Sequence, residues 1–315
     1  MVFQKTSNID KICHIMSIFN TVKIYRNVYR NWFSILFKMW RIQKKKTKET
    51  PAQFMKATLR TEKLNIEVPL GIVSSYAHLM NNENPRIHNA KVTGNLLSFF
   101  YDDHEIKFDF GNSGEIYASF INEEYNFLDV ENKNVIDIGA NIGDTAIYFA
   151  LKGAKKVLSL EPYPTTFALA ENNIEMSEFK DKIQLINSGY GKDRMIKIDS
   201  SFIPDTGSEI VENSKGIDIE IVSLETVIEK YGINYDVLKM DCEGCEYNLL
   251  NEKSEILGKF SKIQIEYHYG YEKLVDKLEE SGFDTKFTSP IKIWNPSAGK
   301  IMIIGYVYGK NRRSA

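Results

Sequence analysis

The sequence predicts an α/β protein with a mostly parallel sheet and helices on both of its faces. Three observations support this fold class. Apolar strand-like runs and helix-like segments alternate from residue 134 onward, a glycine-rich turn joins the first strand to its helix, and an acidic residue follows the second strand. Alternation of this kind is typical of parallel sheets, whose ligands bind at the carboxyl ends of the strands.

The individual elements follow from the periodicity. Before the main domain, a period of two over 97–101 and 106–110 predicts a β-hairpin. The predicted strands of the sheet lie at 134–138, 156–160, 183–187, 219–222, 235–240, 262–267, 283–288 and 301–307. The predicted helices lie at 143–152, 164–177, 223–231, 245–251 and 270–281. The polar residues 200–217 are either a lid or a passive insertion.

Composition and charge limit the class of partner. The chain has 315 residues, of which 43% are hydrophobic and 26% charged, as is typical of a soluble globular protein. Residues 1–60 carry 13 basic and 2 acidic residues, whereas 61–315 carry 27 and 40. This acidic main body disfavours nucleic-acid phosphate, so we expect no nucleic-acid partner. There is no secretory signal or bilayer-spanning run, and three cysteines make no disulfide framework, so we expect a cytoplasmic protein.

The charge pattern also suggests a division into three parts. We predict a basic, aromatic helical arm over 1–50, a small α+β lead-in over 51–130 and the main domain over 131–315. Apolar residues three and four apart predict a helix from about Ile12 to Ile42, and 47–65 resemble a linker. That helix either docks on the body or on a partner, or lies on an anionic membrane surface through residues 12–46, at the inner face of the membrane.

The turn after the first strand has the sequence V-I-D-I-G-A-N-I-G-D-T from Val135 to Thr145. Glycines permit backbone conformations and close ligand approaches that a Cβ would block. The spacing here is G-x-x-x-G, with Asp137 two positions before the first glycine. The dinucleotide fingerprint G-x-G-x-x-G needs a third glycine and cradles a pyrophosphate. This turn therefore suits a nucleoside that carries an amino-acid tail better than it suits a diphosphate.

Two further strand ends extend the predicted ligand site. Glu161, followed by Pro162, ends the second strand about 20 residues after the turn, where an acidic side chain accepts both hydrogen bonds of a ribose diol. Ser188 and Gly189 follow the third strand, where an adenine ring can be bracketed.

The fourth strand ends in a cluster of three carboxylates, Asp241, Glu243 and Glu246. Such clustering is costly unless a cation compensates it, and a sulfonium ion or a metal would do so. Asp241 can also orient or deprotonate an attacking hydroxyl. Cys242 and Cys245 have a spacing known from zinc and redox sites, but without a second pair we interpret them as two small residues that pack the turn.

The next strand supplies a histidine candidate. Glu266 and His268 lie two residues apart and so share a face of their strand. His268 is placed at a carboxyl strand end of the main domain, which makes it the natural general-base candidate, with a purely structural histidine as the alternative.

These stretches together resemble the FkbM family of S-adenosylmethionine-dependent methyltransferases. The resemblance rests on the turn at 135–145, on Leu160-Glu-Pro162, and on Leu238-Lys-Met-Asp-Cys-Glu-Gly-Cys-Glu246 followed by Ile265-Glu-Tyr-His268. The family pattern at the third stretch is similar to K-I-D-V-E-G-A-E. Cys242 and Cys245 stand where that pattern has valine and alanine, which favours packing over zinc. The resemblance covers about 120–310.

The resemblance implies a Rossmann-like class I methyltransferase fold with seven strands, the last antiparallel. It implies S-adenosyl-L-methionine as cofactor and O-methylation of a hydroxyl on a sugar, glycolipid or small metabolite. We assign Asp241, Glu243 and His268 as catalytic and assign no metal ligand. The predicted cofactor-binding residues are Asp137, Gly139, Ala140, Asn141, Gly143, Asp144, Glu161, Pro162, Ser188 and Gly189. The alternatives are an RNA or protein methyltransferase recruited by the basic arm, and a non-catalytic cofactor-binding scaffold.

Overall fold

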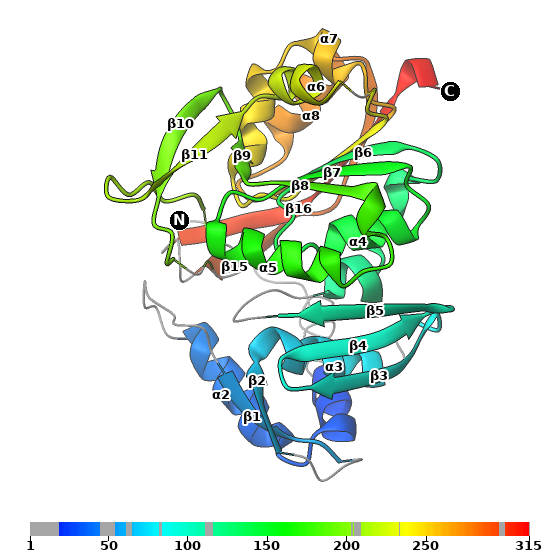
Figure 1. Ribbon diagram of the computed structural model, residues 1–315, viewed down its shortest axis with the longest axis vertical. Coiled ribbons are helices and arrows are strands. Elements are labelled where there is room, and N and C mark those ends of the chain that lie inside the picture. The colour runs from blue at the N-terminus through cyan, green and yellow to red at the C-terminus, as the bar shows by residue number, and fades with distance from the viewer. Residues whose placement is uncertain are drawn as a thin grey trace, which may run out of the picture.

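The central feature of the computed structural model is one large, mostly parallel sheet (Figure 1). The structure describes residues 19–44, 54–60, 65–81, 84–110, 116–202, 204, 209–232, 234–295 and 300–314. From edge to edge the sheet contains β14 (Phe283–Phe287), β16 (Lys300–Asn311), β13 (Lys262–Tyr267), β12 (Val237–Met240), β6 (Asn134–Ile138), β7 (Lys156–Leu160) and β8 (Ile183–Ile186). The strand β15 (Ile291–Asn295) pairs with β16 as well.

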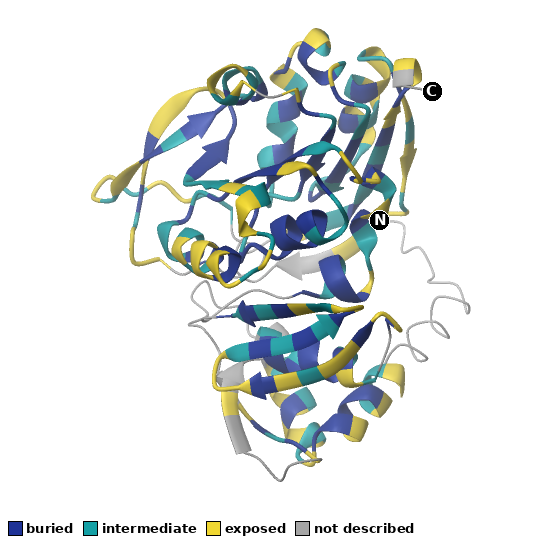
Figure 2. Ribbon diagram, turned by 45° about the vertical axis from the view of Figure 1, so that its right-hand side comes forward, coloured by how far each residue is buried: buried dark blue, intermediate teal, exposed yellow. Residues whose placement is uncertain are grey.

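The strand directions confirm the predicted sheet. The five strands from β13 to β8 are parallel, whereas β16 runs antiparallel to both of its neighbours, β13 and β14. The central strands β6 and β12 are almost entirely buried because helices cover both faces. Figure 1 shows α4 (Asp144–Leu151) and α5 (Pro164–Glu175) on one face, and α6 (Leu224–Tyr231), α7 (Ser254–Leu257) and α8 (Glu272–Glu280) on the other. In Figure 2 the dark blue buried segments run through the middle of these layers.

Two predicted elements take a different form. The segment expected as a strand at 219–222 does form one, β11 (Ile217–Val222), but it lies outside the main sheet. It pairs with β9 (Ser188–Tyr190) and β10 (Arg194–Ile198) in a separate sheet of three strands. The helix expected at 245–251 is the 3₁₀ helix η4 (Cys245–Asn251). Residues 203 and 205–208 lie outside the described residues, so the role of 200–217 as lid or insertion stays a prediction.

The N-terminal region departs further from the sequence prediction. A helix covers 19–28, and α2 (Trp32–Lys44) follows it as a second helix, so the single helix expected from Ile12 to Ile42 is wrong. The break occurs because Tyr29 forms a β-bridge with Leu59 and donates a hydrogen bond from its buried hydroxyl to the Val73 carbonyl at 2.8 Å. Residues 12–18 lie outside the described residues.

The predicted linker at 47–65 is also wrong where it can be examined. The strands β1 (Phe54–Thr58) and β2 (Asn65–Pro69) belong to an antiparallel pair, and α3 (Leu70–Met80) follows them. The hairpin predicted at 97–110 is confirmed as β4 (Leu96–Tyr101) and β5 (His104–Asp109), and β3 (Ile87–Thr93) adds a third strand. No helix among the described residues is long and apolar enough to cross a bilayer.

The lead-in is joined to the main sheet by packing and by hydrogen bonds. One apolar cluster runs from the N-terminal helices through the β3–β5 sheet to α4. The buried Asn173 of α5 accepts a hydrogen bond from the Asp109 N–H at 2.7 Å and donates one to the Asp109 carbonyl at 2.9 Å. These contacts fix β5 against the helix that follows the second strand of the main sheet. The division at residue 130 stays a prediction.

Candidate active site

The glycine-rich turn after β6 is shaped by its contact with the next strand end. Gly139 has a φ of +82°, and a Cβ added to it would lie 1.8 Å from the backbone oxygen of Asp241. The N–H groups of Gly139 and Ala140 donate to the Leu160 carbonyl at 3.1 and 3.0 Å. Gly139 is therefore required because the ends of β6 and β12 touch. The sequence pattern indicated only a close approach of ligand to the turn.

A buried ion pair lies beneath this turn. Lys239 and Asp137, 1% and 0% exposed, are 3.0 Å apart from Nζ to Oδ1. The other oxygen of Asp137 accepts hydrogen bonds from Thr145 and Ser159, and Lys239 also donates to the Gly139 carbonyl at 2.7 Å. Burial alone would lower the pKa of Lys239, but the charges of Asp137 and Asp241 outweigh it and raise this pKa. The Lys239–Asp137 ion pair thus stabilises the glycine-rich turn after β6.

The acidic residue after β7 faces the same turn. Glu161, 5% exposed, accepts a hydrogen bond from the Asn141 N–H through one oxygen and from the Tyr163 N–H through the other, both at 3.0 Å. Burial raises the pKa of Glu161 to about 7. Asp144, at the start of α4, accepts a hydrogen bond from Ser119 at 2.7 Å, and burial likewise raises its pKa to about 7.

These strand ends surround a cavity of about 560 Å³. The cavity is lined by seven of the ten predicted cofactor-binding residues: Gly139, Asn141, Asp144, Glu161, Pro162, Ser188 and Gly189. Asp137, Ala140 and Gly143 are not among the lining residues. Of the three predicted catalytic residues, Asp241 and Glu243 line it and His268 does not.

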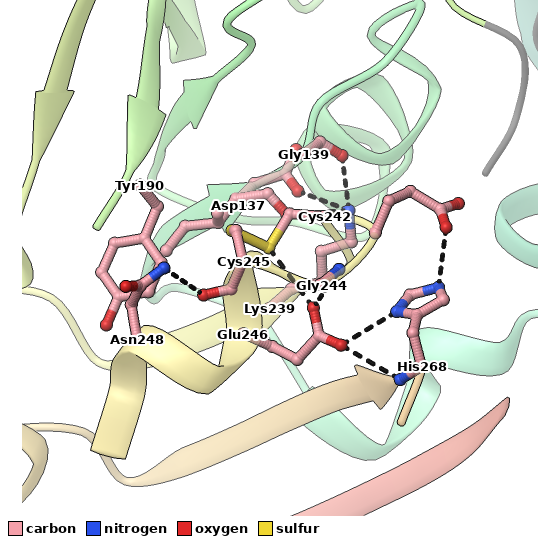
Figure 3. Close-up of a disulfide and its surroundings, with 12 residues drawn as sticks. Asp137, Gly139, Tyr190, Lys239, Cys242, Gly244, Cys245, Glu246, Asn248 and His268 are labelled. Atoms are coloured by element: carbon pink, nitrogen blue, oxygen red, sulfur yellow. Dashed lines mark hydrogen bonds and ion pairs between the residues drawn. A yellow bond between two sulfur atoms is a disulfide. The ribbon is translucent and has the colours of Figure 1, made fainter. Parts of the chain in front are cut away.

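His268 lies behind the cavity wall, held between two carboxylates (Figure 3). Its Nε2 is 3.1 Å from Glu243, and its Nδ1 is 3.0 Å from the fully buried Glu246. Glu246 also accepts hydrogen bonds from the backbone N–H groups of His268 and Gly244. Burial alone would lower the pKa of His268, but the hydrogen bond to Glu246 and the charge of Glu243 raise it to about 10. A protonated imidazole cannot accept a proton, so the structure gives no support to His268 as general base.

A second pair of acids faces the cavity directly. Asp241 accepts a hydrogen bond from the Tyr125 hydroxyl at 3.2 Å. Glu266 lies close to Asp241, and burial together with the charge of Asp241 raises the pKa of Glu266 well above its usual range. Tyr306 donates a hydrogen bond to Glu124 and contacts Glu266 at 3.3 Å. Sequence reasoning assigned no site role to Tyr125, Glu266 or Tyr306, which come together only in the fold.

The two cysteines of the carboxylate cluster are joined by a disulfide (Figure 3). The interpretation of Cys242 and Cys245 as two separate packing residues is therefore wrong, although both are half-buried as expected. The bond closes the turn that contains Glu243 and Gly244, whose φ values of +56° and +113° both lie in the left-handed region. Both cysteines line the cavity, so the disulfide forms part of its wall.

One group of side chains has the composition of a metal site. Ligand atoms of Asp241, Glu243 and His268 all lie within 4.8 Å of one another. A divalent ion would have to displace the proton on the His268 nitrogen that faces Glu243, because imidazole binds metals in its neutral form.

The sheet order with an antiparallel strand second from one edge, and the glycine turn opposite an acidic strand end, define a class I methyltransferase fold. Comparisons with known proteins agree with this fold assignment. Residues 137–285 match the family model of the methyltransferase FkbM domain. An uncharacterized protein of Sulfolobus islandicus rod-shaped virus 1 is 30% identical over 158 residues, which cover 50% of this chain and 73% of that protein. The chain belongs to the FkbM methyltransferase family, and S-adenosylmethionine is its cofactor.

Other similarities are partial. A putative protein N5-glutamine methyltransferase of Methanocaldococcus jannaschii is 31% identical over 93 residues, which cover 28% of this chain and 46% of that protein. Among solved structures, TrmK of M. capricolum in complex with S-adenosyl-homocysteine has a TM-score of 0.36 and 14% identity. That alignment covers 60% of this chain and 68% of the other.

The cavity has the chemistry that this cofactor requires. Glu161 presents a buried carboxylate that a ribose diol can bind, and such hydroxyl donors would favour its charged form. Asp241 and Glu243 line the same cavity and can compensate the positive charge of a sulfonium. When bound, S-adenosylmethionine supplies an electrophilic methyl group.

Proposed function

We propose that this chain methylates a hydroxyl group of a sugar, glycolipid or small metabolite. The observation that carries this proposal is the pair of acids Asp241 and Glu266, which face the cavity beside the predicted donor residues. Burial and the charge of Asp241 raise the pKa of Glu266 well above its usual range. We therefore assign the role of base to Asp241, which accepts the hydrogen bond from Tyr125.

The residues around this pair fit the needs of an alcohol acceptor. An alcohol must lose its proton around the transition state, and a correctly placed carboxylate can accept it. Tyr125 donates a hydrogen bond to Asp241 and so orients it. Tyr306 and Glu124 lie on the same side of the cavity and can bind further hydroxyl groups of a polyhydroxylated acceptor.

We assign Glu243 an electrostatic role in the proposed reaction. The protonated His268, fixed by Glu246, pairs with Glu243 and holds its side chain at the cavity wall. A fixed negative charge there favours the cationic donor over its neutral product. His268 and Glu246 are thus positioning residues and not catalytic ones.

The test is transfer of a labelled methyl group from the donor to a panel of acceptors: monosaccharides, glycolipids, small alcohols, an RNA and a glutamine-containing protein. We expect the label on hydroxyl oxygen. Asp241→Asn should lower kcat by about 100- to 10,000-fold, while the affinity for S-adenosylhomocysteine changes less than about twofold, since the substitution leaves the Glu161 side of the cavity intact. Asp129→Asn, at an exposed site, is the control and should leave kcat unchanged.

Three results would contradict the proposal. Label on RNA alone, or on a protein amide alone, would favour the corresponding alternative acceptor. Donor binding without turnover on any acceptor would favour a non-catalytic scaffold. Loss of activity with a chelator and recovery with a divalent ion would show instead that a metal at Asp241, Glu243 and His268 takes the part that we assign to Asp241 alone.

A further inference from the structure

The helix α2 carries an exposed face of aromatic and basic side chains. Phe33, Phe37 and Trp40 are 67%, 50% and 53% exposed, and their spacing of four and three residues places them on one face of the helix. The exposed Lys38 and Arg41 lie beside them. We call these five residues the aromatic–basic face. The opposite side of α2 packs inward through Ile35, which is 1% exposed.

The three exposed rings form a row of stacked contacts along the helix. Phe33 and Phe37 are stacked with ring centroids 6.4 Å apart, and Phe37 and Trp40 are stacked at 5.9 Å. Burying any of these rings against the apolar cluster beneath would require α2 to rotate and to expose Ile35. A continuous apolar ridge of this kind is unfavourable in water and marks a binding surface.

The charge around the ridge has a single sign. Residues 19–44 contain six lysines and arginines and no aspartate or glutamate. Among them Lys23, Arg26 and Arg30 are exposed, in addition to the two cations on the face. The rest of the chain is acidic, so this positive region is local. An apolar ridge bordered by cations is complementary to the surface of a bilayer with anionic headgroups.

We infer that the aromatic–basic face binds an anionic phospholipid membrane, with α2 lying in the interface. The rings would enter the boundary between headgroups and acyl chains, and Lys38 and Arg41 would contact the phosphates. RNA fits the face less well, because base stacking needs a free ring face and those of Phe37 are shared with its two neighbours. The acidic main body would also repel a strand that extends beyond α2.

The inference does not depend on the proposed reaction, since binding can be measured without donor or acceptor. Full-length protein is mixed with phosphatidylcholine vesicles, with or without phosphatidylserine, and the bound fraction is measured by co-sedimentation. We expect binding only to the anionic vesicles. Phe33→Ser/Phe37→Ser/Trp40→Ser should weaken it by at least about tenfold, and Lys38→Gln/Arg41→Gln by roughly fivefold for each charge removed.

Matched controls separate the face from general changes in charge and apolar surface. Met195→Ser removes an apolar side chain that is 59% exposed, and Lys155→Gln/Lys273→Gln removes two exposed charges elsewhere. Both should bind vesicles as the wild type does. Each variant must also keep the wild-type circular dichroism spectrum and affinity for S-adenosylhomocysteine, which distinguishes loss of the face from loss of the fold.

Two outcomes would overturn the inference. The first is equal binding to neutral and anionic vesicles, or no binding to either, by a folded wild-type protein. The second is tight binding of a single-stranded RNA that is lost in the face variants while vesicle binding is unchanged or absent.

Discussion

Replacement of His268 tests the central electrostatic feature of the site. A rise of the His268 pKa from 6.5 to about 10 corresponds to roughly 5 kcal/mol of preference for the charged imidazole. His268→Gln removes this cation and leaves the fully buried Glu246 without its charged partner, although the backbone hydrogen bonds to Glu246 remain. Breaking a buried pair in this way costs about 3–5 kcal/mol. We therefore expect the free energy of unfolding at pH 6 to fall by about 3–5 kcal/mol.

The pH dependence of this stability difference gives a second, independent test. Because the pKa of His268 is higher in the folded protein than in the unfolded one, its contribution is complete below about pH 6.5 and is lost as the pH rises through about 10. The difference between wild type and His268→Gln should shrink steadily over that interval. Other groups with shifted pKa values, such as Glu161, are present in both proteins and largely cancel from the difference.

The assay is urea unfolding, followed by circular dichroism, at several pH values between 6 and 10. His104→Gln is the matched control, because His104 and Glu178 also form a pair at 2.9 Å, but their side chains are 44% and 52% exposed. A surface pair of this kind contributes only about 0–1 kcal/mol. Glu246→Gln and the double variant complete a cycle in which the second substitution should cost less than the first. A His268→Gln protein as stable as the wild type at pH 6, or a difference that grows with pH, would refute this reasoning.

Two other predictions concern the backbone of the site. Gly139→Ala should prevent folding or lower the free energy of unfolding by more than about 3 kcal/mol, because its Cβ would overlap the Asp241 carbonyl. Gly282 is the control, because it has a similar φ of +92° but nothing within 4 Å of an added Cβ. Gly282→Ala should cost only about 1–2 kcal/mol, measured by thermal unfolding. Cys242→Ser/Cys245→Ser should lower the free energy of unfolding by no more than about 2 kcal/mol, because the disulfide closes a very short loop. A destabilisation as large as that of Gly139→Ala would show that the disulfide stabilises more of the protein than its own turn.

The parts of the fold that the sequence predicted well share a physical cause. Strands β6, β7 and β13 were predicted to the residue, because central parallel strands are continuous apolar runs bounded by turn residues. The antiparallel pair of β1 and β2 was missed, because F-M-K-A-T and N-I-E-V-P are short and mixed in polarity. The break at Tyr29 depends on a bridge to Leu59, a contact that helical periodicity cannot indicate.

The site residues likewise divide into those that local sequence can place and those that only the fold brings together. Glu161 and the glycine turn could be placed from spacing, because the strand-turn-helix unit fixes their positions locally. The role of Lys239 could have been suspected, since a lysine within the buried strand V-L-K-M needs a counter-charge. The protonation of His268 could not be predicted, because it depends on the contact of His268, which follows β13, with Glu243 and Glu246, which follow β12. The C-x-x-C spacing is equally compatible with zinc, packing or a disulfide, and only the backbone of the turn decides among them.

We predict that the cavity between the strand ends holds the methyl donor with its ribose on Glu161. Titration calorimetry with S-adenosylhomocysteine tests it most directly, on wild type, Glu161→Gln and Glu252→Gln. Glu252 is a suitable control, because it is also buried, accepts hydrogen bonds from Tyr190 and from the Leu224 N–H, and is not among the residues that line the cavity. We predict one site per chain, with Kd raised about 10- to 100-fold by Glu161→Gln and unchanged by Glu252→Gln. Equal Kd values for all three proteins would contradict it.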